Sequence, residues 1–203
     1  MLKIGQVRLI GIKYTSLRIN LWYTKLAMPQ TNLKRIYIVG PSGSGKTTLG
    51  KFLCAKFSLP HIELDKIAYP NQKEKPLEKR LSAVARLAQQ PKWVTEGIYI
   101  NWTSALMEKA DLIIWLDLSY KKTLFRVIKR FFVHKLRGDE KFGLKRTVKF
   151  IANLNKYYSN VKGDPEKQTT RAETKEALEP FRKKVVRIRE IKDPEKFLSV
   201  LIP

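Results

Sequence analysis

Short apolar runs alternate with longer amphipathic stretches along this sequence from about residue 34 onward. Residues 35–39 are mostly β-branched or aromatic and end at a glycine-rich turn, which predicts a buried strand. Other apolar runs predict four more strands, at about 61–64, 93–95, 112–116 and 184–188. Helical patterns lie between or after them, at about 46–57, 76–90, 121–137 and 193–201. This alternation predicts an α/β fold with a parallel sheet covered by helices on both faces.

The pattern at 121–137 divides into an apolar face and a basic stripe. The apolar face is expected to pack on the sheet, and its members are Leu124, Val127, Ile128, Phe131 and Leu136. The basic residues recur at spacings of four and seven, with His134 between them, and are Lys122, Arg126, Arg130 and Arg137. Two interpretations stay open: a clamp for phosphate groups, or a solvated basic face of a lysine-rich protein.

A mobile lid is predicted after this helix, at about 138–170. Gly138 and Gly143 flank two acidic residues and are candidate hinges for the lid. Tyr157 and Tyr158 lie within the segment. They either close over a nucleotide base or pack in the interior, and packing is the favoured interpretation.

Residues 40–47 read Gly-Pro-Ser-Gly-Ser-Gly-Lys-Thr and match the phosphate-binding pattern G-x-x-x-x-G-K-[ST] at every fixed position. Glycines allow successive backbone amides to converge on phosphate oxygens, and the following helix N-terminus adds partial positive charge. Lys46 is expected to reach the β- and γ-phosphates, and the Thr47 hydroxyl to bind Mg²⁺. The motif therefore predicts an ATP or GTP site formed by Gly40, Ser42, Gly43, Ser44, Gly45, Lys46, Thr47 and Thr48.

Carboxylates follow three of the predicted strands, at the sheet edge where ligands of open α/β folds bind. Glu63 and Asp65 close the second strand, Glu96 follows the third and Asp117 the fourth. A kinase of this architecture needs one carboxylate to hold water on Mg²⁺ and one to orient or deprotonate the attacking hydroxyl. We assign Glu96 to the metal with Thr47, and Glu63, Asp65 and Glu96 to the acceptor.

Two of these acids also have a plainer interpretation. Asp65 is an alternative N-cap for a helix beginning at Lys66. Glu96 is an alternative solvated loop acid, because Gly97 after it is typical of a turn. Asp117 is a weaker candidate for the magnesium-linked carboxylate.

Charge and cysteine content narrow the classes of function. The 203-residue chain carries 41 Lys and Arg against 18 Asp and Glu, a net charge of +23 that attracts phosphate-rich ligands, nucleic acid or anionic lipid. A single cysteine, Cys54, excludes an internal disulfide and favours a reducing, cytoplasmic compartment. No apolar run reaches the roughly 20 residues of a membrane-spanning helix. The length suits one kinase-like domain over residues 34–203.

Residues 1–33 form a basic N-terminal extension without an acidic residue and without the uninterrupted apolar core of a secretory signal. Three interpretations stay open: a disordered or peripheral basic arm, an organelle-type presequence, or residues upstream of a functional start at Met28. The last is favoured because the first strand follows Met28 closely.

The motifs of residues 36–48, 59–65, 93–97 and 110–117, followed by Arg126 and Arg130, resemble the P-loop kinase-like proteins of the DNA topology modulation family, relatives of adenylate and shikimate kinases. The resemblance covers about residue 34 to the C-terminus. It implies a five-stranded parallel sheet, a nucleotide site at the loop, and an acceptor pocket near Asp65 and Glu96. It also implies a small helical lid carrying arginines such as Arg126, Arg130 and Arg137. The sequence departs from the family's Asp-Gly-Asn at residues 96–98, where it has Glu-Gly-Ile.

Two functions follow from these features. The leading one is a phosphotransferase that uses Lys46, Arg126, Arg130 and Asp65 to move a phosphoryl group from ATP or GTP, with Mg²⁺, to a small acceptor such as a nucleoside or nucleotide. The alternative is a nucleic-acid-associated NTP-binding protein whose positive field holds phosphate backbones. No helix-turn-helix, zinc-finger or RNA-binding signature supports the alternative.

Overall fold

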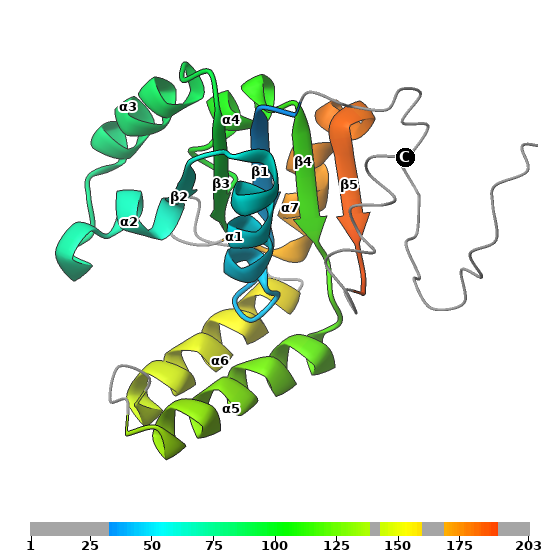
Figure 1. Ribbon diagram of the computed structural model, residues 1–203. Helices are drawn as coiled ribbons and strands as arrows, with labels where there is room; N and C mark the ends of the chain where they lie inside the picture. Colours follow the sequence, from blue (N-terminus) through cyan, green and yellow to red (C-terminus); the bar gives the residue numbers. More distant parts are fainter. Residues whose placement is uncertain (1–32, 139–142, 160–168, 191–203) are drawn as a thin grey trace, which may run out of the picture.

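Five parallel strands form one sheet in the order β2-β3-β1-β4-β5 (Figure 1). The structure is a computed structural model that describes residues 33–138, 143–159 and 169–190. The strands are β1 (Arg35–Val39), β2 (His61–Glu63), β3 (Trp93–Gly97), β4 (Leu112–Leu116) and β5 (Val185–Ile188). The predicted five-stranded parallel sheet is therefore confirmed.

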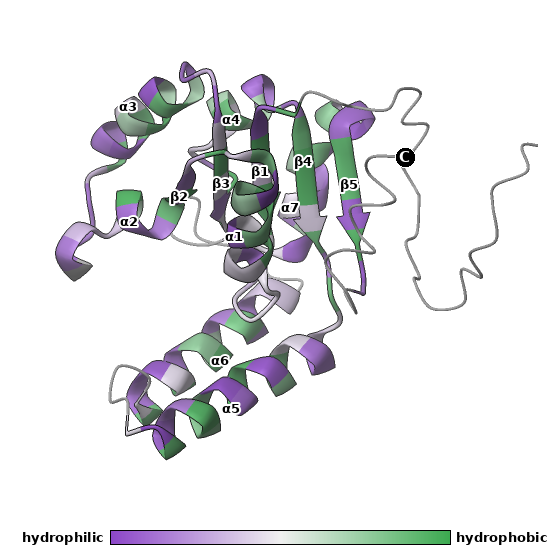
Figure 2. Ribbon diagram, in the orientation of Figure 1, coloured by the Kyte–Doolittle hydropathy of each residue, from purple (hydrophilic) through white to green (hydrophobic). Residues whose placement is uncertain are grey.

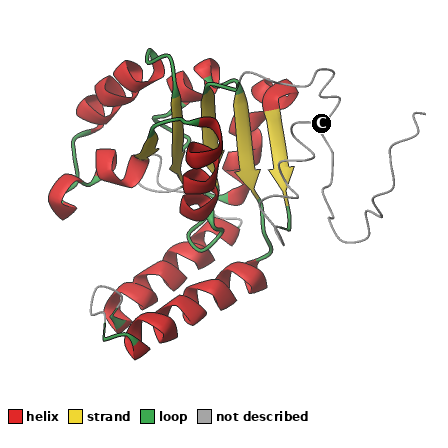
Figure 3. Cartoon of the chain, viewed as in Figure 1, coloured by secondary structure: helices red, strands yellow, loops and turns green. Residues whose placement is uncertain are grey.

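The helices lie between the strands in the sequence, and those other than α5 and α6 cover both faces of the sheet (Figures 1 and 3). They are α1 (Lys46–Phe57), α2 (Leu64–Ala68), α3 (Leu77–Ala88), α4 (Ser104–Lys109), α5 (Tyr120–Leu136), α6 (Leu144–Tyr158) and α7 (Arg171–Leu178), with short 3-10 turns at Pro70–Gln72 and Glu179–Lys184. The boundaries predicted for α1, α3 and α5 hold within two residues, whereas no boundaries were predicted for α2, α4, α6 and α7. The helix predicted at 193–201 lies outside the described residues.

Alternation along β1 divides the core into two layers. Ile36 and Ile38 pack with Leu49 and Leu53 of α1 on one face. Tyr37 and Val39 face the other side, where their cluster includes residues of α2, α3, α4 and α7. All of β1, β3 and β4 is buried apart from Arg35, as expected for parallel strands covered on both faces.

The carboxyl ends of the strands face the α5–α6 hairpin, the pair of antiparallel helices that extends away from the sheet (Figure 1). The apolar face predicted for 121–137 does not pack on the sheet. Val127 is buried, but Ile128 and Leu136 are exposed, and α5 packs along α6 instead. A 17-residue helix is about 25 Å long, so most of it reaches beyond the edge of the sheet.

Asp117 has a structural role and does not line the site of the phosphate loop. Its buried carboxylate accepts hydrogen bonds from Nε of Arg171 at 2.6 Å and Nε of Arg187 at 2.8 Å. The Arg187 guanidinium also lies 4.3 Å from the centre of the Trp115 ring. Asp117 thus joins the end of β4 to β5 and α7, and its interpretation as the magnesium-linked carboxylate is wrong.

Tyr157 packs in the interior and Tyr158 is half-buried beside it, so the packing interpretation favoured from the sequence is confirmed. The Tyr157 hydroxyl accepts a hydrogen bond from Nε1 of Trp115 at 3.1 Å, and the Tyr158 hydroxyl donates to the backbone carbonyl of Leu118. Burial raises the pKa of both phenols. These bonds attach the C-terminal end of α6 to the end of β4.

No helix in the described ranges has both the length and the hydrophobicity needed to cross a bilayer.

Replacing Asp117 with Asn is expected to lower the free energy of unfolding by about 3 kcal/mol, because it leaves the largely buried Arg187 without a compensating charge. Equilibrium unfolding in urea measures the change. Glu176→Gln, on an exposed position of α7, is the control and should alter stability by less than about 0.5 kcal/mol. Equal stability of the two variants would contradict the structural role of Asp117.

Candidate active site

The loop with the phosphate-binding sequence pattern, residues 40–47, connects β1 to α1 at the carboxyl edge of the sheet (Figure 1). Gly43 has a left-handed φ of 78°, and a Cβ atom there would lie 2.8 Å from Cγ2 of Val127 and 2.9 Å from the carbonyl oxygen of Thr123. Only glycine fits this approach of the loop to α5. Nη1 of Arg126 adds a hydrogen bond to the Ser44 carbonyl at 3.0 Å. The loop is therefore braced by α5 as well as by the sheet.

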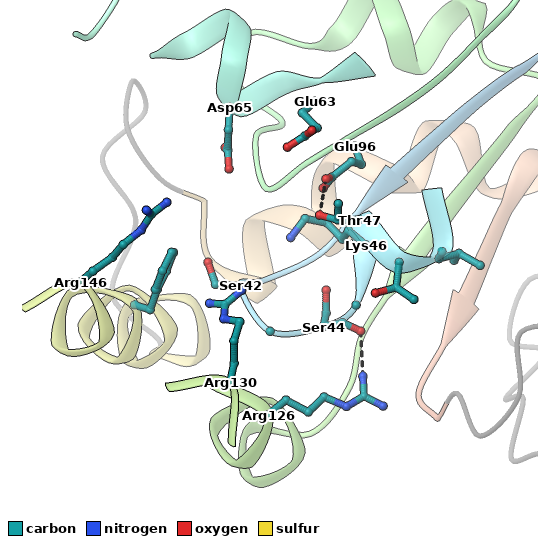
Figure 4. A pocket seen from close by; sticks show the side chains of 15 residues that line it. Ser42, Ser44, Lys46, Thr47, Glu63, Asp65, Glu96, Arg126, Arg130 and Arg146 are labelled. Atoms are coloured by element: carbon teal, nitrogen blue, oxygen red, sulfur yellow. Dashed lines mark hydrogen bonds between the residues drawn. The ribbon is translucent and has the colours of Figure 1, made fainter. Parts of the chain in front are cut away.

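A cavity of about 530 Å³ opens above the loop (Figure 4). Twelve of the predicted site residues line it: Ser42, Gly43, Ser44, Gly45, Lys46, Thr47, Thr48, Glu63, Asp65, Glu96, Arg126 and Arg130. Three lining residues were not predicted, namely Leu49, Arg146 and Phe150. Gly40 and Arg137 were predicted and are absent from the lining. Gly40 lies at the base of the loop, and Arg137 follows the last residue of α5.

Thr47 and Glu96 meet on the floor of the cavity. The Thr47 hydroxyl donates a hydrogen bond of 2.6 Å to Oε1 of Glu96, which closes a separation of 49 residues in the sequence (Figure 4). Because the hydroxyl proton points to Glu96, the oxygen lone pairs remain available to a cation. Hydroxyl and carboxylate oxygens are hard ligands of the kind that Mg²⁺ prefers. Among the described residues, no group of three or more His, Cys, Asp or Glu could hold a metal alone, so a cation here would also need ligands from a substrate or water.

Lys46 extends over the loop, and its Nζ donates to the Pro41 carbonyl at 3.0 Å. Burial lowers the pKa of this ammonium, with a further lowering by the Arg130 charge, and Glu96 and Asp65 partly offset the shift. A bound anion would favour the protonated form. An anion bound at the loop would therefore stabilise the buried, charged form of Lys46.

Two further acids lie on the opposite side of the cavity from the arginines (Figure 4). Asp65 accepts a hydrogen bond of 2.9 Å from the Tyr99 hydroxyl, whose pKa is raised by burial and by the Asp65 charge. Glu63 pairs with Lys66 at 2.8 Å. Helix α2 begins at Leu64, so Asp65 lies in its first turn and is not the N-cap of a helix beginning at Lys66. Glu96 is buried in β3, which removes its interpretation as a solvated loop acid.

The arginines of the hairpin differ in orientation. Arg126 is turned to the loop backbone, whereas Arg130 and Arg146 extend toward the cavity (Figure 4). The guanidinium carbons of Arg130 and Arg146 lie 4.8 and 5.7 Å from the centre of the Phe150 ring. Burial and the neighbouring Arg146 lower the pKa of Arg130. Two cations held close together on one ring favour binding of an anion between them.

Arg146 and Phe150 were missed because their segment was treated only as a lid. Their spacing of four places both on one side of α6, and the segment has an amphipathic pattern that indicates a helix. That pattern could have located the helix. The side of α6 that faces the cavity depends on how α6 packs against α5, and the sequence alone does not give this.

Comparison with known proteins relates both the sequence and the fold to other chains. No family model matches. The sequence is 30% identical over 131 residues to the uncharacterized protein YqaC of Bacillus subtilis (strain 168), covering 60% of this chain and 72% of that protein. It is 29% identical over 111 residues to the shikimate kinase of Sulfurihydrogenibium sp. (strain YO3AOP1), covering 47% of this chain and 67% of that enzyme.

The fold is similar to that of a solved shikimate kinase from Acinetobacter baumannii in complex with shikimate. The TM-score is 0.51 at 14% identity, with 85% of this chain and 94% of that chain covered. The architecture is therefore that of a P-loop kinase fold. The DNA topology modulation family is not among these matches.

Replacing Gly43 with Ala is expected to destabilise the protein by about 2 kcal/mol, because the methyl group is strained in the left-handed region and also collides with α5. Thermal or urea unfolding measures the effect. Gly138→Ala is the matched control, since Gly138 has a φ of 67° but no neighbour within 4 Å of the added Cβ. Equal losses in the two variants would show that the contact between loop and helix contributes nothing.

Proposed function

The chain belongs to the same family as the Bacillus subtilis protein YqaC, and from its site geometry we propose that it is a P-loop phosphotransferase acting on a small acceptor. One observation carries the proposal. A single cavity brings Lys46 and Thr47 of the loop together with Glu96 and Asp65 from strand ends and Arg130 from the hairpin. Kinases use this combination of phosphate cradle, metal-associated acid, acceptor acid and charge-compensating arginine.

The donor in this proposal is ATP or GTP. Its phosphates would lie on the backbone amides of the Walker A loop at the N-terminus of α1, with Lys46 beside the β- and γ-phosphates. Gly40 would act through the shape of the loop rather than through contact, because it is outside the cavity lining. Bound phosphates would stabilise the buried ammonium of Lys46, whose pKa is lowered by burial.

Mg²⁺ fits the Thr47 and Glu96 pair by the chemistry of its oxygens. The Thr47 hydroxyl would bind the ion directly. Glu96 would orient that hydroxyl and accept a hydrogen bond from a water bound to the ion. A bound Mg²⁺ would supply positive charge that neutralises the phosphates.

Asp65 is the proposed acceptor-side base. It faces the cavity, and the Tyr99 hydroxyl fixes its carboxylate in place. In the transfer the acceptor oxygen bonds to the γ-phosphorus, the bond to the nucleoside diphosphate breaks, and the acceptor proton passes to the Asp65 carboxylate. Glu63 and Glu96 line the same cavity and would contact the acceptor's other polar groups. The similarity to a shikimate kinase, an enzyme named for a small-molecule acceptor, supports a small-molecule acceptor here.

The hairpin is proposed as the lid of the active site. Arg130 and Arg146 would approach the transferring phosphoryl group, and Arg126 would hold the loop in register with them. We propose the mobile part within 138–170, of which residues 139–142 and 160–168 lie outside the described ranges. Arg137 would contact substrate only if the lid moves toward it.

The finer assignments are also proposals. We place residues 34–203 in one kinase-like domain working in the cytoplasm, and treat 1–33, of which only Leu33 is described, as an extension. A role in DNA topology modulation rests on the sequence resemblance alone. The net charge of +23 favours one second candidate, an NTP-binding protein that acts on nucleic acid.

Purified protein with Mg²⁺ and labelled ATP or GTP is expected to transfer the label to one member of a panel of nucleosides, nucleotides, sugars and shikimate. Lys46→Ala should reduce the rate by about 100-fold or more, because it removes a charge from the transferring group. Lys56→Ala, an exposed lysine of the same helix, is the control and should retain the rate.

Single-stranded and duplex DNA are tested in parallel. Turnover that appears only with nucleic acid, and labels no small acceptor, would replace the phosphotransferase with the second candidate.

Arg146→Gln is expected to lower the rate constant of transfer by roughly 10-fold or more, with a smaller change in ATP affinity, because the guanidinium compensates charge that develops during transfer. Rates at saturating substrate and equilibrium ATP binding separate the two effects. The neighbouring exposed Lys145→Gln is the control. A loss confined to ATP affinity would assign Arg146 to ground-state binding instead.

A further inference from the structure

The α5–α6 hairpin exposes a stripe of large apolar side chains. On α5 they are Phe125, Ile128, Phe132 and Leu136, and on α6 they are Leu144 and Val148. Leu136 is 88% exposed and Phe125 is 66% exposed. Single exposed apolar residues are normal on a protein surface, but several large ones gathered on one hairpin mark an interaction site. Among the exposed large hydrophobics of the described ranges, only Leu81 lies outside the hairpin. We call these six hairpin residues the apolar stripe.

The stripe is separate from the active-site cavity. Its α5 members recur at spacings of three, four and four, which keeps them on one side of the helix. Arg130 follows Phe125 by five residues and so lies about 140° away around the helix. None of the six residues lines the cavity. The hairpin thus presents arginines to the cavity on one side and apolar side chains to solvent on another. Figure 2 shows hydrophobic and hydrophilic positions alternating along both helices.

Lysines flank the stripe. Lys121 and Lys129 stand one turn before and one turn after Phe125, and both are exposed. Lys135 lies beside Leu136, with Nζ 6.0 Å from the centre of the Phe131 ring. Helix α5 carries six Lys or Arg and α6 carries four, and neither contains Asp or Glu. A partner of this face must therefore be both apolar and anionic.

We infer that the apolar stripe and its flanking lysines form a docking surface for an anionic lipid bilayer. An amphipathic helix with phenylalanine and leucine on one face and lysines beside them is typical of helices that lie in the membrane interface. The apolar side chains enter the boundary between headgroups and acyl chains, about 5–10 Å deep. The lysines extend along the surface and place their ammonium groups among the phosphates.

Other occupants fit this face less well. Residues 1–27 carry five Lys or Arg and no acid, so the N-terminal segment is repelled by the same charge. A second copy would bring an identical basic face against this one. Nucleic acid matches the charge and has the rings of Phe125 and Phe132 to stack on, but the four aliphatic members of the stripe offer it neither a ring nor a hydrogen bond. A bilayer uses both the charge and the aliphatic side chains.

The test is co-sedimentation of the full-length protein with vesicles of phosphatidylcholine alone or mixed with phosphatidylglycerol. Binding to the mixed vesicles is expected, with little binding to phosphatidylcholine and weakening as salt is raised. Phe132→Ser combined with Leu136→Ser should reduce the partition coefficient by roughly 10-fold or more, because two apolar side chains no longer enter the interface. Lys129→Gln combined with Lys135→Gln should reduce both the binding and its salt dependence.

Leu81→Ser is the matched control, since it removes an exposed apolar side chain from α3 and should leave vesicle binding unchanged. Circular dichroism and thermal unfolding check that the variants are folded, which is expected because both replaced side chains are exposed. Vesicle binding that persists in the folded stripe variant would overturn the inference. The inference would also be overturned if the wild-type protein does not bind vesicles containing phosphatidylglycerol but does bind duplex DNA or an acidic protein.

Discussion

The contact between the phosphate loop and α5 connects the two halves of this structure. Gly43 approaches Val127 and Thr123 so closely that no side chain fits, and Arg126 holds the Ser44 carbonyl from the same helix. The loop is thereby fixed between the sheet, which carries the acids, and the hairpin, which carries the arginines. Because protein interiors are close-packed and transmit strain, a change at this contact would move the arginines of the hairpin relative to the acids of the strand ends. The geometry of the cavity depends on it.

The distribution of charge in the cavity follows from this arrangement. Acids come from the strand ends, where Glu96 is buried against Thr47 and Asp65 is held by Tyr99. Cations come from the loop and the hairpin. In the proposed phosphotransferase, the anionic phosphates would bind on the side of the cations. The hydroxyl acceptor would bind on the side of the acids, so the phosphoryl group would move from the cationic side toward the acidic side. The hairpin has a second polarity of its own, with arginines toward the cavity and the apolar stripe toward solvent.

Much of the fold and part of the site could be read from the sequence. The strands at 35–39 and 112–116 and the helix at 46–57 were located to the residue, because β-branched runs, glycine punctuation and helical periodicity are local signals. Ten of the predicted site residues belong to the loop or follow strands, which a parallel fold brings to one edge, and the structure places them in one cavity with Arg126 and Arg130. Arg146 was missed, Arg137 does not line the cavity, and the ion pairs of Asp117 were not foreseen, since local pattern does not tell which neighbour a charged side chain meets.

The sequence by itself determined the sheet, the loop and the excess of positive charge, because each depends on residue type and spacing along the chain. Only the tertiary structure decided that α5 leaves the sheet to pair with α6, that Asp117 is occupied by Arg171 and Arg187, and that Arg146 joins Arg130 over Phe150. These outcomes depend on contacts between segments tens of residues apart. Helical periodicity specifies that a face is apolar, but the packing of the whole chain selects what that face meets.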